Sequence, residues 1–395
     1  MRNISDDRRP PYRASEILAG IEWTGPPYKY PGTHTDMHWQ TWADDGALWV
    51  VDDDGENFGN PWNFAHLLRV TGTPPNHQVE EISRFPELQR PSIERFRYVD
   101  GAVAVGSRLY VAAYDYNWHD PRPAVGNAWE LEGTTPKKVG EEAFFVDAMS
   151  EHAGVAALMY SDDRGATWQN VPGDETPYFL GPRFAGLAFV GFGPGYTGIP
   201  LEFGDFVYAV SNDQNWEGGD HVFLARAPRD RILDRSRWEF WAGRGAGHWT
   251  VAPLWTADED AATPIYSDHG YTGHPTMTWN PGLGRFLLAI GSDSTPHHWD
   301  VPSETARDTW HRRRELKILE GPTPWGPWGL FHFDANWEGE RVAYLPQIPP
   351  NWLSADGYEG TLLFSGDYKF PFIESVAKDE NFYGFMTRPF RLLPC

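Results

Sequence analysis

The stretch Ser161-Asp162-Asp163-Arg164-Gly165-Ala166-Thr167-Trp168 gives the clearest fold signal in this 395-residue chain. It follows the apolar run Ala156–Ser161 and reads as a tight turn that leads into another strand. An Asp side chain inside such a turn can accept hydrogen bonds from the backbone amides around it, and Gly165 allows a positive φ. We expect Thr167 to start the next strand and Trp168 to pack under the turn. The stretch therefore predicts a hairpin between two outer strands of a sheet.

Short strands between turn residues account for most of the remaining chain. Helical periodicity is sparse, and the best window for a short helix or helical turn is Pro228–Trp238. The clearest strand candidates are Ala47–Asp52, Arg108–Ala113, Phe206–Ser211, His221–Arg226, Arg285–Ile290 and Thr361–Gly366. Because these strands do not alternate with long helices, the sequence excludes a parallel βαβ sheet.

The strands recur in five loose modules, at residues 34–79, 97–171, 186–242, 272–334 and 343–393. A repeated module of four strands is typical of a propeller blade. We therefore predict an all-β chain whose residues 1–395 form a single five-bladed β-propeller, with four-stranded antiparallel blades. A β-sandwich is the alternative, but a long chain without an interdomain linker favours one closed ring.

The charge and aromatic content of the chain limit the classes of molecule that it is expected to bind. The formal net charge is −22, which disfavours nucleic acid and anionic membrane surfaces as partners. No stretch approaches the length of a membrane-spanning helix. The 20 Trp, 17 Tyr and 23 Phe supply core packing, and they also suit sugar binding, in which flat sugar faces stack on aromatic rings. A closed ring is expected to be a monomer.

The chain has one cysteine, Cys395, so neither an intrachain disulfide nor a cysteine-based metal site is expected. The N-terminal residues lack the apolar region of a signal peptide. The sequence leaves both a cytoplasmic protein and an exported one open.

The stretch Ser161–Trp168 fits the pattern S-x-D-x-G-x-T-W and resembles the Asp-box, or BNR repeat, of sialidase-like propellers. The resemblance implies a propeller, with the box at the periphery of a blade and in a structural role. Sialidases of this kind usually carry several boxes and an arginine triad. Since one full box is present and no triad can be placed, sialidase activity is disfavoured.

A second resemblance covers residues 22–366. The segment Asp36–Trp49 and the turn Asp53–Gly55 are similar to a family of bacterial propellers known as a domain of unknown function. Further similar segments are Leu224–Ile232, Trp238–Gly243, Thr278–Leu288, Pro324–Trp328, Trp352–Gly357 and Phe364–Asp367. Members of that family resemble glycoside hydrolases, including endo-acting D-arabinanases. The resemblance implies a glycoside hydrolase acting on arabinan-like or related polysaccharide or oligosaccharide linkages.

This chain departs from the family pattern at His38 and Asp52–Asp54, and it carries insertions at Asn117–Phe144 and Ser292–Arg314. These segments would frame a pocket, so they leave the substrate open. We include His38 among the candidate substrate-binding residues.

Two aspartates are the predicted catalytic pair. Glycoside hydrolysis usually needs two carboxyl groups. Asp36 lies just before the first predicted inner strand, and Asp54 lies just after the next strand. A meander brings those two ends to the same face. The alternative is that both are ordinary turn residues.

Further candidates occupy equivalent positions in the other modules. Aspartates that end apolar strands are Asp115, Asp213, Asp293 and Asp367. His274, before the fourth inner strand, could bind substrate or act as a base. Arg183, before the third, could bind a substrate oxygen with both guanidinium nitrogens. Each of these residues also has an ordinary structural interpretation.

Tryptophans in loop-like stretches could form sugar platforms, namely Trp39, Trp62, Trp118 and Trp216. No cofactor is predicted. The oxygen-rich run Asp52–Asn57 could hold Ca²⁺, although it lacks EF-hand spacing. Two other functions stay open on the same scaffold. One is a polysaccharide lyase that uses His274 or a Tyr as base and Arg183 to neutralise a uronate, and the other is a non-catalytic glycan-binding propeller.

Overall fold

The structure is a computed structural model of the chain. It describes residues 9–61, 63–85, 95–117, 128–132, 135–139, 155, 157–172, 179–184, 186–213, 219–244, 253–293, 314–339, 341–367 and 382–395. Within these ranges it holds strands and short 3-10 turns, and no helix there is long and apolar enough to cross a membrane.

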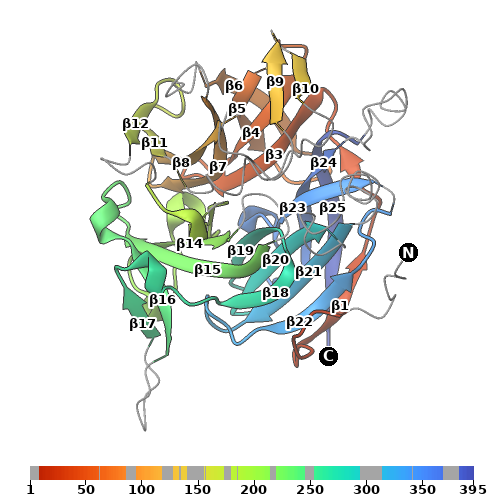
Figure 1. Ribbon diagram of the computed structural model, residues 1–395. Coiled ribbons are helices and arrows are strands. Elements are labelled where there is room, and N and C mark those ends of the chain that lie inside the picture. The colour runs from red at the N-terminus through yellow and green to blue at the C-terminus, as the bar shows by residue number, and fades with distance from the viewer. Residues whose placement is uncertain are drawn as a thin grey trace.

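Five antiparallel sheets surround a central axis (Figure 1). Blade 1 contains β3 (Thr33–Trp42), β4 (Leu48–Asn57), β5 (Asn63–Thr71) and β6 (Gln78–Arg84). Blade 2 contains β7 (Arg95–Val105), β8 (Arg108–Asn117), β11 (Ala157–Ser161) and β12 (Gln169–Pro172), with the separate hairpin β9 (Ala128–Glu132) and β10 (Thr135–Val139) between β8 and β11 in the chain. Blade 3 contains β13 (Ala188–Phe189), β14 (Phe206–Asn212), β15 (Gly219–Pro228), β16 (Glu239–Arg244) and β17 (Pro253–Thr256), and β18 (Tyr266–Thr272) also pairs with β15.

Blades 4 and 5 complete the ring. Blade 4 contains β19 (His274–Asn280), β20 (Arg285–Asp293), β21 (Arg314–Gly321) and β22 (Gly329–Asp334). Blade 5 contains β23 (Val342–Gln347), β24 (Glu359–Asp367) and β25 (Gly384–Pro394), and β1 (Leu18–Trp23) and β2 (Tyr28–Lys29) both pair with β25. The predicted five-bladed all-β propeller is confirmed.

The ring closes because the two ends of the chain share blade 5. The N-terminal strand β1 pairs antiparallel with β25 and forms the outer edge of that blade. The innermost strands β3, β7, β13, β19 and β23 contact one another in ring order, and β23 returns to β3. The module drawn from the sequence at residues 343–393 did not include this N-terminal strand.

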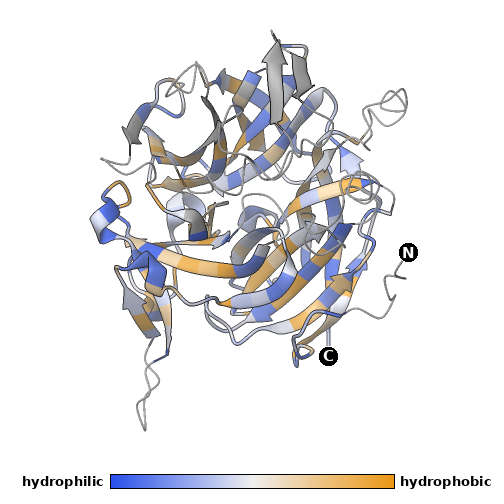
Figure 2. Ribbon diagram, in the orientation of Figure 1, coloured by the Kyte–Doolittle hydropathy of each residue, from blue (hydrophilic) through white to orange (hydrophobic). Residues whose placement is uncertain are grey.

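The core lies between neighbouring blades. Side chains on strands such as β21 and β23 are buried along their whole length, because each of these sheets is covered on both faces. Hydrophobic and hydrophilic bands alternate along the strands (Figure 2). The largest cluster contains aromatic residues of all five blades, including Trp39, Phe184 and Tyr344.

The turn quoted first has the geometry expected from its sequence. It joins the outer strands β11 and β12, and Asp163 Oδ1 accepts the Thr167 amide at 2.8 Å. Asp163 Oδ2 accepts the Thr167 hydroxyl at 2.6 Å, and Gly165 has φ of 84°. Trp168 packs on Phe85 of blade 1, with ring centroids 4.6 Å apart. The turn therefore packs blade 2 against blade 1.

Candidate functional site

One end of the ring collects the polar groups that could act on a ligand. The inner strands run in the same direction, so the starts of β3, β19 and β23 lie at one end of the axis. The following antiparallel strands bring the ends of β4, β20 and β24 to that same end. We call this end the Asp36 face.

Asp36 is half-buried near the start of β3 and faces two partners. The Tyr344 hydroxyl of blade 5 donates a hydrogen bond of 2.6 Å to Asp36 Oδ2. Asp53 lies directly opposite Asp36 in the β3–β4 register, is 1% exposed, and hydrogen-bonds to it side chain to side chain. Two carboxyl groups in hydrogen-bond contact cannot both be ionised at low cost, so ionisation of one disfavours ionisation of the other.

The pKa of Asp36 is raised, because burial disfavours the charged carboxylate. Hydrogen bonds from Asp53, Tyr344 and Tyr383 oppose this rise, because they stabilise the ionised form. The site therefore holds a carboxyl that keeps its proton to higher pH than an exposed Asp does.

Two β-bulges bring Asp36 and Tyr344 together. The register of β3 slips between Asp36 and Trp39, and that of β23 slips between Tyr344 and Gln347. In each bulge the next residue has a left-handed backbone, Met37 at φ of 50° and Leu345 at φ of 51°. Such conformations cost free energy in non-glycine residues, and bulges of this kind re-aim side chains.

The side chain of Gln347 joins the two bulged strands, β3 and β23, through hydrogen bonds. It is 3% exposed, its Nε2 donates to the His38 carbonyl, and its Oε1 accepts the Gln40 amide at 3.2 Å. Ser365 Oγ accepts the His38 amide at 3.1 Å in the same seam. The contact between Asp36 and Tyr344 therefore rests on a seam of hydrogen bonds between blades 1 and 5.

His274 and Trp39 lie deeper on the axis. The His274 ring of blade 4 lies 5.9 Å from the Tyr344 ring and 6.3 Å from the Trp39 ring of blade 1. Because blades 1 and 4 are not neighbours in the ring, Trp39 reaches across the axis. Trp39 is 1% exposed, so its ring is buried and does not form an open platform.

His38 lies behind Asp36, in a buried polar network. Its Nδ1 is 3.0 Å from Ser365 Oγ, and its Nε2 is 3.3 Å from Thr35 Oγ1. Burial, with the nearby His66, lowers the pKa of His38 to about 3. The Thr35 hydroxyl also donates to Asp52 Oδ2 at 2.5 Å, and burial raises the pKa of Asp52 well above its usual range. His38 is thus neutral and supports the wall of the site.

Arg183 and Asp213 make contacts within blade 3. Arg183 Nη1 donates to the Ala262 carbonyl at 2.9 Å, and its guanidinium lies 5.4 Å from the Phe223 ring centroid. Asp213 Oδ1 accepts the amides of Asp220 at 2.9 Å and His221 at 3.1 Å. The described contacts of both residues are structural.

Several predicted residues fall outside what the structure describes. Asp293 and Asp367 are the last residues of β20 and β24, whereas Asp54 and Asp115 lie inside β4 and β8, a few residues before these strands end. The side chains of all four are outside the described part. Trp62, Trp118 and Trp216 are outside it entirely. The roles assigned to these residues stay predictions.

Sequence reasoning missed Asp53, Tyr344, Gln347 and Arg314. Arg314 begins β21, is 2% exposed, and its guanidinium lies 5.6 Å from the Tyr344 ring centroid. Asp53 could have been found from the strand period, because neighbouring residues of a strand such as Asp52 and Asp53 point to opposite faces. Tyr344 and Gln347 sit in an apolar run that reads as a buried strand, and no local signal distinguishes them.

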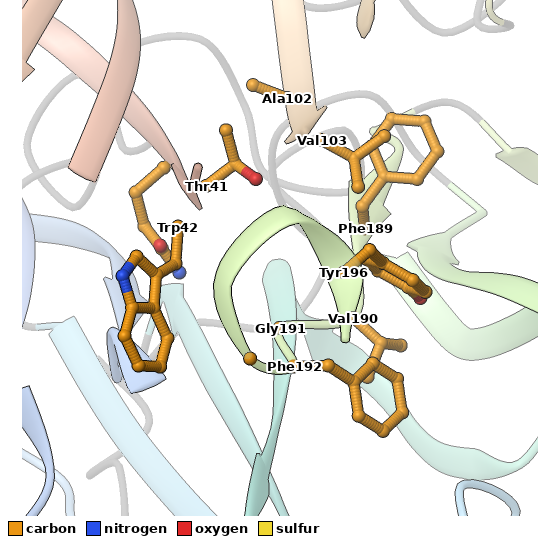
Figure 3. A pocket seen from close by; sticks show the side chains of 11 residues that line it. Thr41, Trp42, Ala102, Val103, Phe189, Val190, Gly191, Phe192 and Tyr196 are labelled. Carbon is orange, nitrogen blue, oxygen red and sulfur yellow. The ribbon is translucent and has the colours of Figure 1, made fainter. Parts of the chain in front are cut away.

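A small hollow lies between blades 1, 2 and 3 at the other end of the ring (Figure 3). Thr41, Trp42, Ala102, Phe189 and Tyr196 line it with neighbouring residues, and they lie at or beyond the far ends of the inner strands. Among the described residues, this lining holds no carboxyl, histidine or lysine. The titratable groups described above lie at the Asp36 face instead.

Among the described residues, no three His, Cys, Asp or Glu side chains converge as a metal site would require. The Ca²⁺ prediction at Asp52–Asn57 includes Asp54, whose side chain lies outside the described part, and it stays a prediction. Within the same run, the Asp52 carboxylate accepts the Asn57 side-chain amide at 3.1 Å.

Comparison with known proteins gives one family match. A family model described as "Domain of unknown function (DUF4185)" matches residues 142–347, more than half of the chain. No curated protein matches.

Several solved structures are similar in fold. A GH43_1 enzyme from Xanthomonas citri in complex with xylose is 13% identical, with a TM-score of 0.47 over 94% of this chain and 90% of its own. An alpha-L-arabinofuranosidase from Podospora anserina in complex with cellotriose is 10% identical, with a TM-score of 0.46 over 96% and 98%. An alpha-L-arabinofuranosidase from Lactobacillus brevis is 12% identical, with a TM-score of 0.45 over 93% and 95%.

Proposed function

This chain belongs to the DUF4185 family, a domain family of unknown function, and we propose that it is a glycoside hydrolase acting at the Asp36 face. The observation that carries the proposal is the Asp36 carboxyl, which is held at the axis by Asp53 and Tyr344 and has a raised pKa. A carboxyl that keeps its proton to higher pH than an exposed Asp does can act as the general acid on a glycosidic oxygen.

Asp36 and Asp53 have different roles and do not lie on opposite sides of the substrate as a catalytic pair would. The two carboxyls of a glycosidase lie about 5–5.5 Å apart for retention and about 6.5–9.5 Å apart for inversion. Because Asp36 and Asp53 are in hydrogen-bond contact, no sugar or water fits between them. Asp53 is therefore a positioning residue that holds the Asp36 carboxyl in place, while burial keeps the pKa of Asp36 raised.

A second carboxyl must serve as base or nucleophile. Asp54 remains our candidate, because it follows Asp53 in β4 at the same end of the ring. The aspartates that end β20 and β24, Asp293 and Asp367, are the next choices. Each of these three aspartates would be replaced by alanine. The second carboxyl is the one whose replacement abolishes activity and whose alanine variant regains activity when azide is added.

The substrate class follows from the resemblance of Asp36–Trp49 and the later segments to propellers that include D-arabinanases. We propose a polysaccharide or oligosaccharide with furanosidic or related linkages. The acidic net charge of −22 favours a neutral glycan over a polyanion.

A polysaccharide lyase is the second candidate, and one observation favours it. A phenol, an imidazole and a guanidinium gather at the site as Tyr344, His274 and Arg314. A phenol could remove the proton beside a uronate carboxylate while a guanidinium neutralises that carboxylate. In this candidate mechanism Arg314, and not the predicted Arg183, would neutralise the uronate.

A product screen separates these candidates. Arabinan, arabinogalactan, xylan and polygalacturonate would be incubated with the protein and analysed by chromatography and ultraviolet absorbance. Saturated oligosaccharides establish the hydrolase, and ultraviolet-absorbing unsaturated products establish the lyase. Binding without any product would replace both with a non-catalytic glycan-binding propeller.

A further inference from the structure

Phe58 is an exposed aromatic residue at the rim of the Asp36 face. It directly follows β4, which carries Asp53, and its side chain is 39% exposed. A single exposed apolar residue is ordinary on a protein surface. Phe58 is distinguished by its backbone conformation and by the contacts that hold its ring, not by exposure alone.

The backbone of Phe58 is strained. Its φ is 54°, in the left-handed region that bulky residues rarely adopt. Burial does not offset this strain, because the ring stays exposed. Strained residues of this kind cluster at ligand sites.

The ring is nevertheless held in place. The Phe58 amide donates to the Gly32 carbonyl at 2.6 Å, and a Cβ added at Gly32 would lie 2.9 Å from Phe58 Cδ1. Gly32, with φ of 84°, thus lets the ring pack directly on the backbone. Tyr30 meets Phe58 edge-on, with centroids 6.4 Å apart and an angle of 80° between the rings. The result is a fixed aromatic surface rather than a freely rotating side chain.

The rim position fixes the distance to Asp36. Phe58 is level with Gly32, and Asp36 lies four residues further along β3. At a rise of about 3.3 Å per residue, the two are roughly 13 Å apart along the strand. A single monosaccharide bound at Asp36 does not span that distance, whereas a glycan chain does.

We propose that Phe58 is a platform on which a sugar ring of the substrate chain stacks, several units away from the bond that is cleaved. This inference rests on the proposed function and adds a binding subsite to it. An aromatic ring offers a sugar face a large rigid apolar surface at little cost in side-chain entropy.

Four variants test the platform: Phe58→Ala, Phe58→Trp, Phe58→Gly and, as control, Leu201→Ala. Leu201 is 98% exposed and precedes β14 at the other end of the ring, so it matches Phe58 as an exposed apolar side chain. The probe is whichever of arabinan, arabinogalactan or xylan the wild-type protein cleaves. Affinity electrophoresis in gels containing that polysaccharide and kcat/KM on the polymer and on its shortest cleaved oligosaccharide are the measurements.

We expect Phe58→Ala to lower affinity and kcat/KM on the polymer about tenfold, with a much smaller change on the short oligosaccharide. Phe58→Trp should restore the polymer values. Phe58→Gly should lose affinity as alanine does while raising the melting temperature relative to Phe58→Ala, because glycine accepts the left-handed backbone.

Equal losses on long and short substrates, or no loss in Phe58→Ala, would overturn the platform and leave the proposed function standing. A wild-type protein that neither binds nor cleaves any glycan of the panel would overturn both. A loss of the same size in Leu201→Ala would also contradict the subsite.

Discussion

The Tyr344 hydroxyl donates a 2.6 Å hydrogen bond to Asp36 Oδ2, and this bond joins blade 5 to blade 1 beside the central axis. It links two strands that are 308 residues apart in the chain. The bond favours the ionised form of Asp36, whereas burial favours the protonated form. The balance between them sets the pH range in which Asp36 can donate a proton.

Replacing Tyr344 with Phe tests that balance. Loss of the donated bond should raise the pKa of Asp36 further, since one group that stabilises its carboxylate is gone. With Asp36 as general acid, the high-pH limb of kcat should move to higher pH, and kcat at the optimum should fall about tenfold. The measurement is the pH profile of kcat on the cleaved polysaccharide.

Tyr208→Phe is the matched control for Tyr344→Phe. Tyr208 is buried in blade 3, and its hydroxyl donates to the Phe203 carbonyl at 2.6 Å. It should lower stability without moving the pH profile. A high-pH limb that stays in place in Tyr344→Phe would contradict the role given to this bond.

Gln347→Leu tests the seam between blades 1 and 5. The change leaves the His38 carbonyl and the Gln40 amide without their partner in the interior, at a cost of about 1–3 kcal/mol. We expect a lower melting temperature and, because Asp36 loses its alignment with Tyr344, a lower kcat with little change in KM. Thermal unfolding and steady-state kinetics measure the two effects.

Thr278→Val is a control on another seam. The Thr278 hydroxyl donates to the Ile348 carbonyl at 2.7 Å and joins blades 4 and 5. It should lower the melting temperature and spare kcat. Equal losses of kcat in both variants would show that Gln347 acts only through overall stability.

Much of the fold follows from local patterns. The turn at Ser161–Trp168 predicts its hairpin because its hydrogen bonds join residues within a few positions of one another. The strand run Ala47–Asp52 falls within β4 for the same reason, since apolar runs bounded by turn residues need no distant partner. The N-terminal strand β1 could not be placed, because its partner β25 lies at the other end of the chain.

The site depends on register, which the sequence shows poorly. Asp36 was predicted because it precedes an apolar run, but it lies inside β3, and its partner in the neighbouring strand is Asp53 and not Asp54. A shift of one residue moves a side chain to the other face of a sheet, and bulges such as the one at Met37 create such shifts. Tyr344 is brought to Asp36 by a second bulge, in β23 of blade 5. The contact between the two residues therefore depends on closure of the ring and cannot be predicted from local sequence.

Asp52→Asn should change stability in a pH-dependent way. Burial raises the pKa of Asp52 above its unfolded value of about 3.9, so the wild-type folded state loses relative stability as pH rises from about 4 through the raised pKa. The asparagine cannot ionise, and its free energy of unfolding relative to wild type should therefore increase with pH. Urea unfolding between pH 4 and pH 8 gives the difference, and a constant offset would contradict the account.

Asp163→Asn should show the opposite dependence. Hydrogen bonds from Thr167 and Ser161 lower the pKa of Asp163 to about 2. Its stabilising contribution is complete above the unfolded pKa of about 3.9 and is lost as pH falls through about 2. The melting temperature of the variant should lie below that of wild type at pH 6 and approach it at pH 2. An unchanged melting temperature at pH 6 would show that the Asp163 hydrogen bonds in this turn do not stabilise the fold.

The most direct test of the account is the rate of product formation by Asp36→Asn. The asparagine keeps the size of the side chain and can still accept the Tyr344 hydrogen bond, so the variant should fold with a melting temperature near that of wild type. We expect kcat on the polysaccharide that wild type cleaves to fall about 10²- to 10⁴-fold, with saturated products in the remaining activity. A folded Asp36→Asn protein that cleaves the glycan at the wild-type rate would contradict the central claim.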